Sequence, residues 1–199
     1  PTRGLISLRG IVPLAPTFDH LGPMTRDVLE CEPLLAALAG VERPRNRQAL
    51  RRYAVSPRIA DLDPDVADGF ERALAALPGE RVEPSPPAAR LDVLSDFFEL
   101  MLTEMLVFHR RFADRRSEYR PAVRARLEHA ERRAMTAEEY VAGQVGRAED
   151  TAAWCDWLDE HGIDAVVEPT LPIVAPVRGH GDDETFGDLD DLSLTHYWD

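Results

Sequence analysis

The sequence predicts a mixed α/β fold, in which several helices cover a sheet that these 199 residues complete only in part. Three observations predict it. Short apolar runs near both ends of the chain are typical of strands, and the middle carries long stretches with apolar residues at helical spacing. The order of these segments is strand, several helices, strand, which favours helices packed on a sheet. The predicted strands are too few to complete that sheet.

Residues 1–24 are predicted to form short extended pieces and turns, because Pro and Gly recur in them. A helix is expected over residues 25–39, with Thr25 as its N-cap and Gly40 as its stop. Pro33 conflicts with this helix, since an interior proline removes a backbone hydrogen bond and should kink it. The apolar residues that share one face of the helix are expected to be buried, namely Val28, Cys31, Leu35, Leu38 and Ala39.

The middle of the chain is predicted to be mostly helical, with one strand over residues 53–59 and a proline-rich loop over residues 78–88. Helices are expected over residues 63–77, 90–112, 121–133 and 136–161. The last of these begins with a capping box at Thr136 and Glu139, and Gly162 ends it. The side chains expected on its buried face are Tyr140, Val145, Trp154 and Leu158.

The C-terminal part is predicted to contain a short buried strand over residues 163–167 and an acidic loop over residues 178–191. Histidines and acids gather near this loop, but their spacing matches neither a zinc site nor a calcium-binding loop. The residues concerned are His161, His180, Asp182, Asp183 and Glu184. We therefore expect a solvated acidic loop and no metal.

Composition argues against several classes of function. The net charge of −13 disfavours general binding to nucleic acid or to an anionic membrane. No apolar run approaches the ~20 residues of a membrane span. Two cysteines are too few for a disulfide framework, which is typical of a reducing compartment, and we therefore expect a cytoplasmic protein. The 23 basic residues counted as Lys and Arg are all Arg. A buried Lys can act as a base, whereas Arg keeps its proton. Because the chain has no lysine, it cannot supply a lysine base.

Two segments of the sequence resemble the amidase signature family. Residues 1–40 read Pro-Thr-x-Gly-x-x-Ser, then Pro-Leu, then Asp-x-x-Gly-Pro-Met-x-Arg, then a helix that ends Leu-x-Ala-Leu-x-Gly. The matching residues are Pro1, Thr2, Gly4, Ser7, Pro13, Leu14, Asp19, Gly22, Pro23, Met24, Arg26, Leu35, Ala37, Leu38 and Gly40. Residues 164–176 resemble the family's strand that leads to Pro-Thr-x-Pro-x-x-Ala-Pro, and residues 194–199 resemble the segment before its Gly-Leu-Pro stretch.

The resemblance implies amide hydrolysis by a serine nucleophile, a second serine on a cis peptide and a neutral lysine, without metal or cofactor. In the family these groups precede the Pro-Thr pair, so they are expected before Pro1. No catalytic residue is therefore assigned in this chain, and the chain alone is expected to be inactive. It is expected to form one partial domain, with a post-catalytic loop and helix at 1–40, a variable helical substrate-side region at 41–160 and a strand and loop returning to the core at 161–199.

Four residues of the first segment are candidates for a role at the site. Thr2 and Ser7 directly follow the family's catalytic stretch, and two readings stay open for them: their hydroxyls hydrogen-bond the nucleophile loop, or they only satisfy backbone groups of a turn. Asp19 and Arg26 are expected to form a partly buried pair that pins the loop to the helix. A structural role for this pair is favoured over a catalytic one.

Two features of the middle region allow more than one interpretation. An aromatic and methionine stripe could line a substrate pocket, but such a stripe is more often core. It consists of Phe97, Phe98, Met101, Met105 and Phe108. Residues 109–133 carry nine Arg against four acids, and we prefer a solvated face with ion pairs over a nucleic-acid patch.

The resulting functional hypothesis is part of an amidase that acts on a small-molecule amide, with no nucleic-acid or membrane partner and with a homodimer left open. Three alternatives remain. The first is a protein like the A subunit of an aminoacyl-tRNA amidotransferase, and the second is a non-catalytic binding member of the family. The third is an unrelated helical interaction module.

Overall fold

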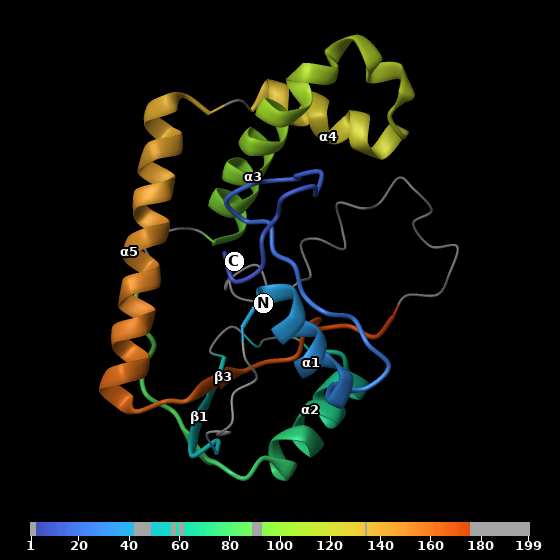
Figure 1. Ribbon diagram of the computed structural model, residues 1–199. Coiled ribbons are helices and arrows are strands. Elements are labelled where there is room, and N and C mark those ends of the chain that lie inside the picture. The colour runs from blue at the N-terminus through green and yellow to red at the C-terminus, as the bar shows by residue number, and fades with distance from the viewer. Residues whose placement is uncertain are drawn as a thin grey trace.

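The computed structural model describes residues 3–41, 49–56, 59, 62–88, 93–133 and 135–175. Its helices are α1 (Val28–Ala39), α2 (Pro64–Ala76), α3 (Val93–His109), the 3₁₀ segment η1 (Arg110–Glu118), α4 (Pro121–Arg132) and α5 (Ala137–His161). Its strands are β1 (Arg52–Val55), β2 (Glu80–Val82) and β3 (Ala165–Val167). The predicted α/β class is confirmed: the sheet lies at one end of the molecule, the packed helices α3 and α4 lie at the other, and α5 runs between the two ends (Figure 1).

The sheet is parallel and has the strand order β2-β1-β3. Tyr53 of β1 is opposite Arg81 on one side and Ala165 on the other. The expected strand over residues 53–59 is shorter than predicted and ends at Val55. The loop prediction for residues 78–88 is wrong where β2 forms, because three residues without apolar alternation acquire strand geometry only by pairing with β1.

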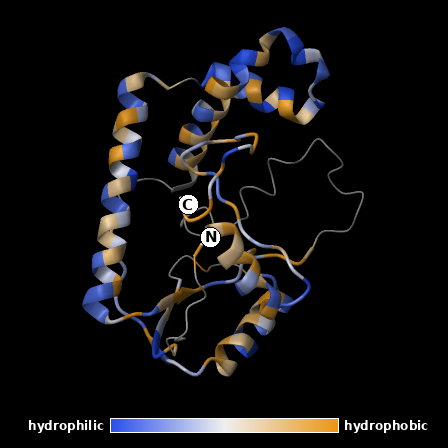
Figure 2. Ribbon diagram, in the orientation of Figure 1, coloured by the Kyte–Doolittle hydropathy of each residue, from blue (hydrophilic) through white to orange (hydrophobic). Residues whose placement is uncertain are grey.

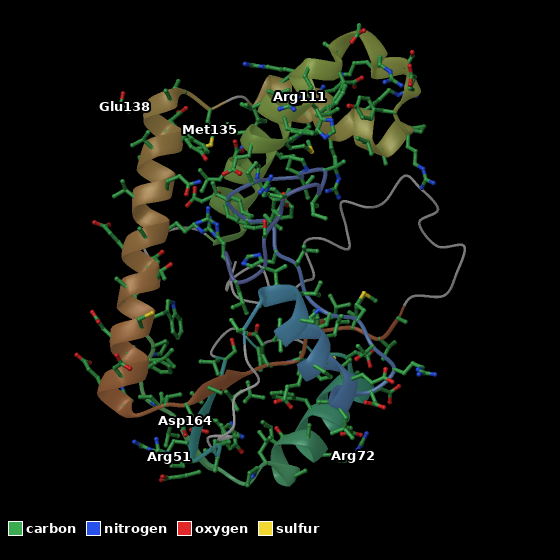
Figure 3. All side chains as sticks on the ribbon, viewed as in Figure 1. Arg51, Arg72, Arg111, Met135, Glu138 and Asp164 are labelled. Atoms are coloured by element: carbon green, nitrogen blue, oxygen red, sulfur yellow. The ribbon has the colours of Figure 1, made fainter. Side chains whose placement is uncertain are left out.

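The amino ends of β1 and β3 are held together by a carboxylate. Asp164 accepts hydrogen bonds from the backbone N–H groups of Arg51 and Arg52 at 2.8 and 3.0 Å, and the Arg51 guanidinium lies 3.3 Å from its other oxygen (Figure 3). The bonds from Arg52 and then Arg51 hold the pKa of the Asp164 carboxyl below its usual value. This contact fixes the register of the two strands where they begin.

Helix α2 connects β1 to β2 and begins where the sequence predicts. Pro64 occupies the first turn, and the Asp63 side chain accepts from the Asp65 N–H at 2.9 Å. Leu74 is buried, and the Tyr53 hydroxyl donates to the Leu74 carbonyl at 3.4 Å. Helix α2 therefore covers the face of the sheet that carries Tyr53.

Helices α3 and α4 form the larger hydrophobic cluster together with Ala15 and Phe18 of the N-terminal segment, and Tyr140 of α5 packs against it. Its most buried members are Ala15, Leu100, Met105, Leu127 and Ala130. The predicted capping box of α5 is confirmed, with Thr136 and Glu139 bonding each other's backbone N–H, and Gly162 ends the helix in the left-handed conformation. Trp154 is buried as expected, whereas Val145 is exposed, which corrects the predicted buried face.

Helix α1 differs from its prediction at its start and in its burial. The N-cap is Asp27, which accepts from the Glu30 N–H at 3.0 Å, and Thr25 instead donates to the Asp27 carbonyl. The helix ends at Gly40, as predicted, and it includes Pro33, which was expected to conflict with it. No residue of α1 is fully buried. On the predicted apolar face Cys31, Leu35 and Ala39 are half-buried, whereas Val28 and Leu38 are exposed, Val28 by 84%. Figure 2 shows α1 coloured largely toward the hydrophobic end.

The helix expected over residues 90–112 also changes character before its predicted end. It is α-helical to His109 and continues as the 3₁₀ segment η1, whose backbone leaves helical angles at Phe112 and Arg115. Pro121 then opens α4 as expected. Among the described residues, no helix combines the length and the apolarity that a membrane crossing requires.

Candidate functional site

A cavity of about 460 Å³ opens at the carboxyl ends of β1 and β2. We call it the carboxyl-edge cavity. Its lining comes from four parts of the chain: the end of β1 with the residues after it, helix α2, the end of β2 with the loop after it, and one residue of α5. The lining residues are Ala54, Val55, Ser56, Ile59, Leu62, Ala67, Phe70, Glu71, Arg81, Val82, Glu83, Pro84, Pro86 and Trp157.

The walls of the carboxyl-edge cavity are mostly apolar and are held by fixed contacts. The indole N–H of Trp157 donates to the Ser85 carbonyl at 2.8 Å, which ties α5 to the loop after β2. Trp154 packs edge-on against Trp157 with ring centroids 5.1 Å apart, and both belong with Ala54 to the smaller hydrophobic cluster. These contacts determine the position of the Trp157 ring at the cavity wall.

Four polar residues reach the same cavity. Ser56 is 3% exposed, and its backbone N–H donates to the Val167 carbonyl at 3.0 Å, which continues the pairing of β1 and β3. Arg81 and Glu83 form an ion pair with an N–O distance of 3.1 Å, and Glu71 comes from α2. The described lining thus carries one positive and two negative side chains around an apolar interior.

A second polar cluster lies between the N-terminal segment and the helices, centred on a buried carboxylate. Glu104 of α3 is 8% exposed. One of its oxygens accepts from the Thr17 N–H at 2.8 Å. The other accepts from the Thr17 hydroxyl, from the Tyr140 hydroxyl at 2.8 Å and from the Gln144 amide at 3.3 Å. We call these residues, with Arg147, the Glu104 network.

Arg147 extends the Glu104 network to an aromatic contact. Its guanidinium donates to the Thr17 carbonyl at 3.0 Å and lies 4.0 Å from the ring centroid of Phe18. Phe18 in turn packs edge-on against Phe97 of α3, with centroids 5.0 Å apart. The network therefore joins residues 17–18 to both α3 and α5.

Tyr140 is a neutral donor in this network at ordinary pH. Burial raises the pKa of its hydroxyl above the usual value, and the hydrogen bond to Glu104 and the charge of that carboxylate raise it further, against opposing effects from Gln144 and Thr17. The arrangement can hold a loop in place.

The chain is similar to known amidases and to amidotransferase subunits. No family model matches the chain. An amidase of Pseudomonas putida is 28% identical over 90% of the chain, which covers 42% of that protein. The A subunit of the glutamyl-tRNA(Gln) amidotransferase of Pelobacter propionicus is 37% identical over 37% of the chain, or 19% of that protein.

The chain is also similar to a solved structure. The crystal structure of an amidase superposes on 98% of the chain and 47% of its own length, with a TM-score of 0.79 and 26% sequence identity. These likenesses support the resemblance of the chain to the amidase signature family. The chain spans less than half the length of the solved amidase and of these curated relatives.

Three of the four residues predicted from the amidase-signature motif lie in the described part of the chain. Thr2 lies outside the described residues. The Ser7 hydroxyl accepts from the Arg9 N–H at 3.3 Å, in an exposed turn. Asp19 accepts from the N–H groups of Leu14 and Ala15 at 3.0 and 3.1 Å.

Arg26 pairs with a residue one helical turn further along the chain. The Arg26 guanidinium lies 3.2 Å from the Glu30 carboxylate, and the Arg26 side chain is 91% exposed. The expected Asp19–Arg26 pair is therefore replaced in the structure by two local contacts. Both contacts are local: a turn brings Asp19 beside the N–H groups of Leu14 and Ala15, and the first turn of α1 brings Glu30 beside Arg26, which directly precedes the N-cap.

The aromatic and methionine stripe of α3 belongs to the core, which was the favoured interpretation of the sequence. Met101 and Met105 are buried in the larger cluster, with Phe97 and Phe98 packed against it. No residue of the stripe is among those that line the carboxyl-edge cavity. Phe108 carries the Arg111 guanidinium 4.3 Å from its ring centroid.

Residues 109–133 form ion pairs at the surface, as the sequence led us to expect. Arg115 pairs with Glu118, Arg116 with Glu131 and Arg133 with Glu99.

Residues that could bind a metal are not gathered in the described part of the chain. His109 is one residue of a type that binds metals, and burial, followed by the charges of Arg116 and Arg111, lowers the pKa of its side chain below the usual value. Across the described residues no three His, Cys, Asp or Glu side chains lie together as metal ligands. The acidic loop expected at 178–191 lies outside those residues.

Sequence reasoning missed both the Glu104 network and the cavity. One signal for the network was present: Glu104 interrupts the apolar stripe of α3, and a lone acid on a buried face needs hydrogen-bonding partners. No comparable signal marked the cavity, because its lining is assembled from segments that lie far apart in the sequence.

Proposed function

We propose that the chain is part of an amidase that hydrolyses a carboxamide C–N bond outside peptides, giving a carboxylate and ammonia or an amine. The observation that carries the proposal is the likeness to the crystal structure of an amidase over nearly the whole chain. The amidase of Pseudomonas putida supports it, since it matches across 90% of the chain. The proposed substrate is a small molecule, and the proposed reaction uses no metal or cofactor.

The mechanism that we propose uses a serine nucleophile, a second serine on a cis peptide and a neutral lysine. The lysine takes a proton through the bridging hydroxyl as the nucleophile attacks the amide carbon, and backbone N–H groups bind the resulting oxyanion. The amine leaves with a proton, and water then hydrolyses the acyl-enzyme. These groups lie outside the present sequence, which has no lysine, so the 199 residues alone are proposed to be inactive.

In this proposal the chain contributes structure around the site. The Glu104 network anchors the loop that comes after the Pro-Thr motif, and Thr2 and Ser7 are proposed to support the nucleophile loop through their hydroxyls. Asp19 stabilises the turn that leads into Gly22-Pro23 by its two backbone contacts. The protein is proposed to act in the cytoplasm, without nucleic acid or membrane partners, as a monomer or a homodimer.

The decisive experiment compares two polypeptides on a panel of simple amides. One is the 199-residue chain, and the other continues upstream of the Pro1 codon through the same reading frame. We expect turnover only from the longer polypeptide, and only if the added sequence holds a lysine followed by a Gly/Ser-rich stretch. Turnover by the 199 residues alone would contradict the proposed mechanism. An extended form that binds amides without cleaving them would instead identify a non-catalytic member of the family.

A second candidate is a component of a multi-protein amidotransferase. It is favoured by the relatives named as A subunits of glutamyl-tRNA(Gln) amidotransferases, although these match over restricted segments, such as 92 residues at 37% identity in Pelobacter propionicus. Co-purification with tRNA and with another protein would support it. The unrelated helical module is disfavoured by the likeness to an amidase along 98% of the chain.

A further inference from the structure

We propose that the carboxyl-edge cavity binds a ligand that carries a flat apolar ring and no negative charge. The cavity has a volume of about 460 Å³, within the range of small-molecule sites, and it combines apolar walls with a few polar groups. Position, wall geometry and charge each contribute to the inference.

The position of the cavity is the one at which open parallel sheets bind ligands. The strand order β2-β1-β3 means that the chain leaves β1 toward one side for β2 and later returns on the other side for β3. The strand order therefore reverses beside β1. Open parallel sheets usually bind ligands in the crevice at such a reversal, just outside the carboxyl ends of the strands. Ser56, the residue after β1, lines the cavity and is bonded to the end of β3.

Helices on the two faces of the sheet supply the ring-bearing walls. Tyr53 contacts α2 and its neighbour Ala54 clusters with Trp157 of α5, and successive strand residues face opposite sides of a sheet. Phe70 therefore reaches the cavity from one face and Trp157 from the other. Two prolines of the loop after β2 complete the apolar surface, and the bond from Trp157 to Ser85 holds that loop in place. Walls that are fixed before binding favour a flat, rigid group.

The charges at the cavity disfavour an anion. Arg81, the cation among the described lining residues, pairs with Glu83 at 3.1 Å, and Glu71 adds a second carboxylate. A bound carboxylate would meet two like charges and a guanidinium that is partly neutralised. An uncharged amide or an ammonium group meets no such repulsion.

As a subsite of the proposed amidase, the cavity would select amides whose ring-bearing part is uncharged or cationic. That assignment rests on the proposed function, whereas ligand binding itself does not. Binding and turnover are therefore measured separately. If the chain binds the ligand but the longer protein does not hydrolyse amides, this inference stands and the proposed function is overturned.

The test uses the 199-residue chain and three probes of similar size: 3-phenylpropionamide, 3-phenylpropylamine and 3-phenylpropionate. Binding is followed through the NMR signal of the Trp157 indole N–H, assigned with Trp157→Phe. We expect the amide and the amine to shift this signal, and the carboxylate to bind about fivefold more weakly. Equal affinity for the carboxylate and the amide would overturn the charge argument. A Trp157 signal that none of the probes shifts, up to their solubility limits, would overturn the site.

Two sets of variants separate the walls from the charges. Ala67→Phe fills the cavity from α2 and should weaken amide binding about tenfold, whereas Ala73→Phe, exposed on the same helix and absent from the lining, should change it by less than about twofold. Glu71→Gln with Glu83→Gln should bring the affinity for the carboxylate to within about twofold of that for the amide. If Ala67→Phe unfolds the chain, Ala67→Leu replaces it. Unchanged amide affinity in a folded Ala67 variant contradicts the proposal.

Discussion

The helical end of the molecule and the side formed by α1 and α2 use similar apolar residues in different ways. At the helical end, α3, α4 and α5 bury one another's side chains, and Leu100 and Leu127 are almost completely enclosed. Helix α1 buries no residue, and α2 fully buries only Leu74. Apolar residues at helical spacing show which face a helix would bury, but burial also requires a partner that the fold brings into reach.

The same comparison explains where a buried charge is tolerated. Glu104 lies at the helical end and accepts hydrogen bonds from Thr17, Tyr140 and Gln144, so its carboxylate exchanges water for protein donors. An acid of α1 such as Glu30 has no such need, since it pairs with Arg26 at the surface. The helical end is therefore the part in which single substitutions should have the largest effects.

The largest expected effect is at the centre of the helical cluster. Leu127→Ala should lower the free energy of unfolding by about 3 to 5 kcal/mol, because Leu127 is 0% exposed and its neighbours can only partly fill the cavity. Val28→Ala in α1 should change it by less than about 0.5 kcal/mol. Chemical denaturation measures both. Similar losses for the two variants would show that α1 is covered in solution, and the comparison between the two regions would fail.

The next effect concerns the Glu104 network. Glu104→Ala leaves the donors of Thr17, Tyr140 and Gln144 without their acceptor and should lower the free energy of unfolding by about 2 to 4 kcal/mol. Glu104→Gln keeps the oxygen that accepts from the two side chains of α5 but turns an N–H toward the Thr17 N–H. Its loss should therefore be roughly half as large. Chemical denaturation of the two variants gives both values.

Hydrogen exchange at Thr17 gives an independent readout for both Glu104 variants. Exchange of the Thr17 N–H should accelerate in each, since that N–H loses its acceptor. The exposed pair of Arg115 and Glu118 supplies the control, as Glu118→Gln should leave stability nearly unchanged. Full protection of Thr17 in Glu104→Ala would contradict the anchoring role.

The smallest effects come from replacing glycine by alanine at one position in each region. A Cβ at Gly143 of α5 would lie 2.9 Å from a methyl carbon of Leu100, which is 1% exposed and cannot move aside freely. Gly143→Ala should therefore destabilise by about 1 to 2 kcal/mol. At Gly69 of α2 the nearest atom is the end of Arg72 at 3.8 Å, and Gly69→Ala should stabilise by about 0.5 to 1 kcal/mol through helix propensity. Thermal unfolding of the pair shows the sign directly, and equal signs would mean that the two helices are packed alike.

The sequence predicted the local features of the fold well. Pro64, the Thr136 capping box and the stops at Gly40 and Gly162 all lie where they were expected. The candidate site was predicted far less well. Asp19 and Arg26 were expected to meet, and each has another partner in the structure. The carboxyl-edge cavity and the Glu104 network were not predicted, although the acid within the apolar stripe of α3 was visible.

The sequence by itself determined where most helices begin and end, and it determined that no lysine is present to act as a base. Both are local properties, because a cap acts over three or four residues and composition needs no fold. Only the tertiary structure decided that residues 80–82 form a strand, that α1 stays exposed and that Glu104 binds Thr17, 87 positions away. Strand pairing, burial and long-range hydrogen bonds depend on the path of the whole chain, which no short pattern records.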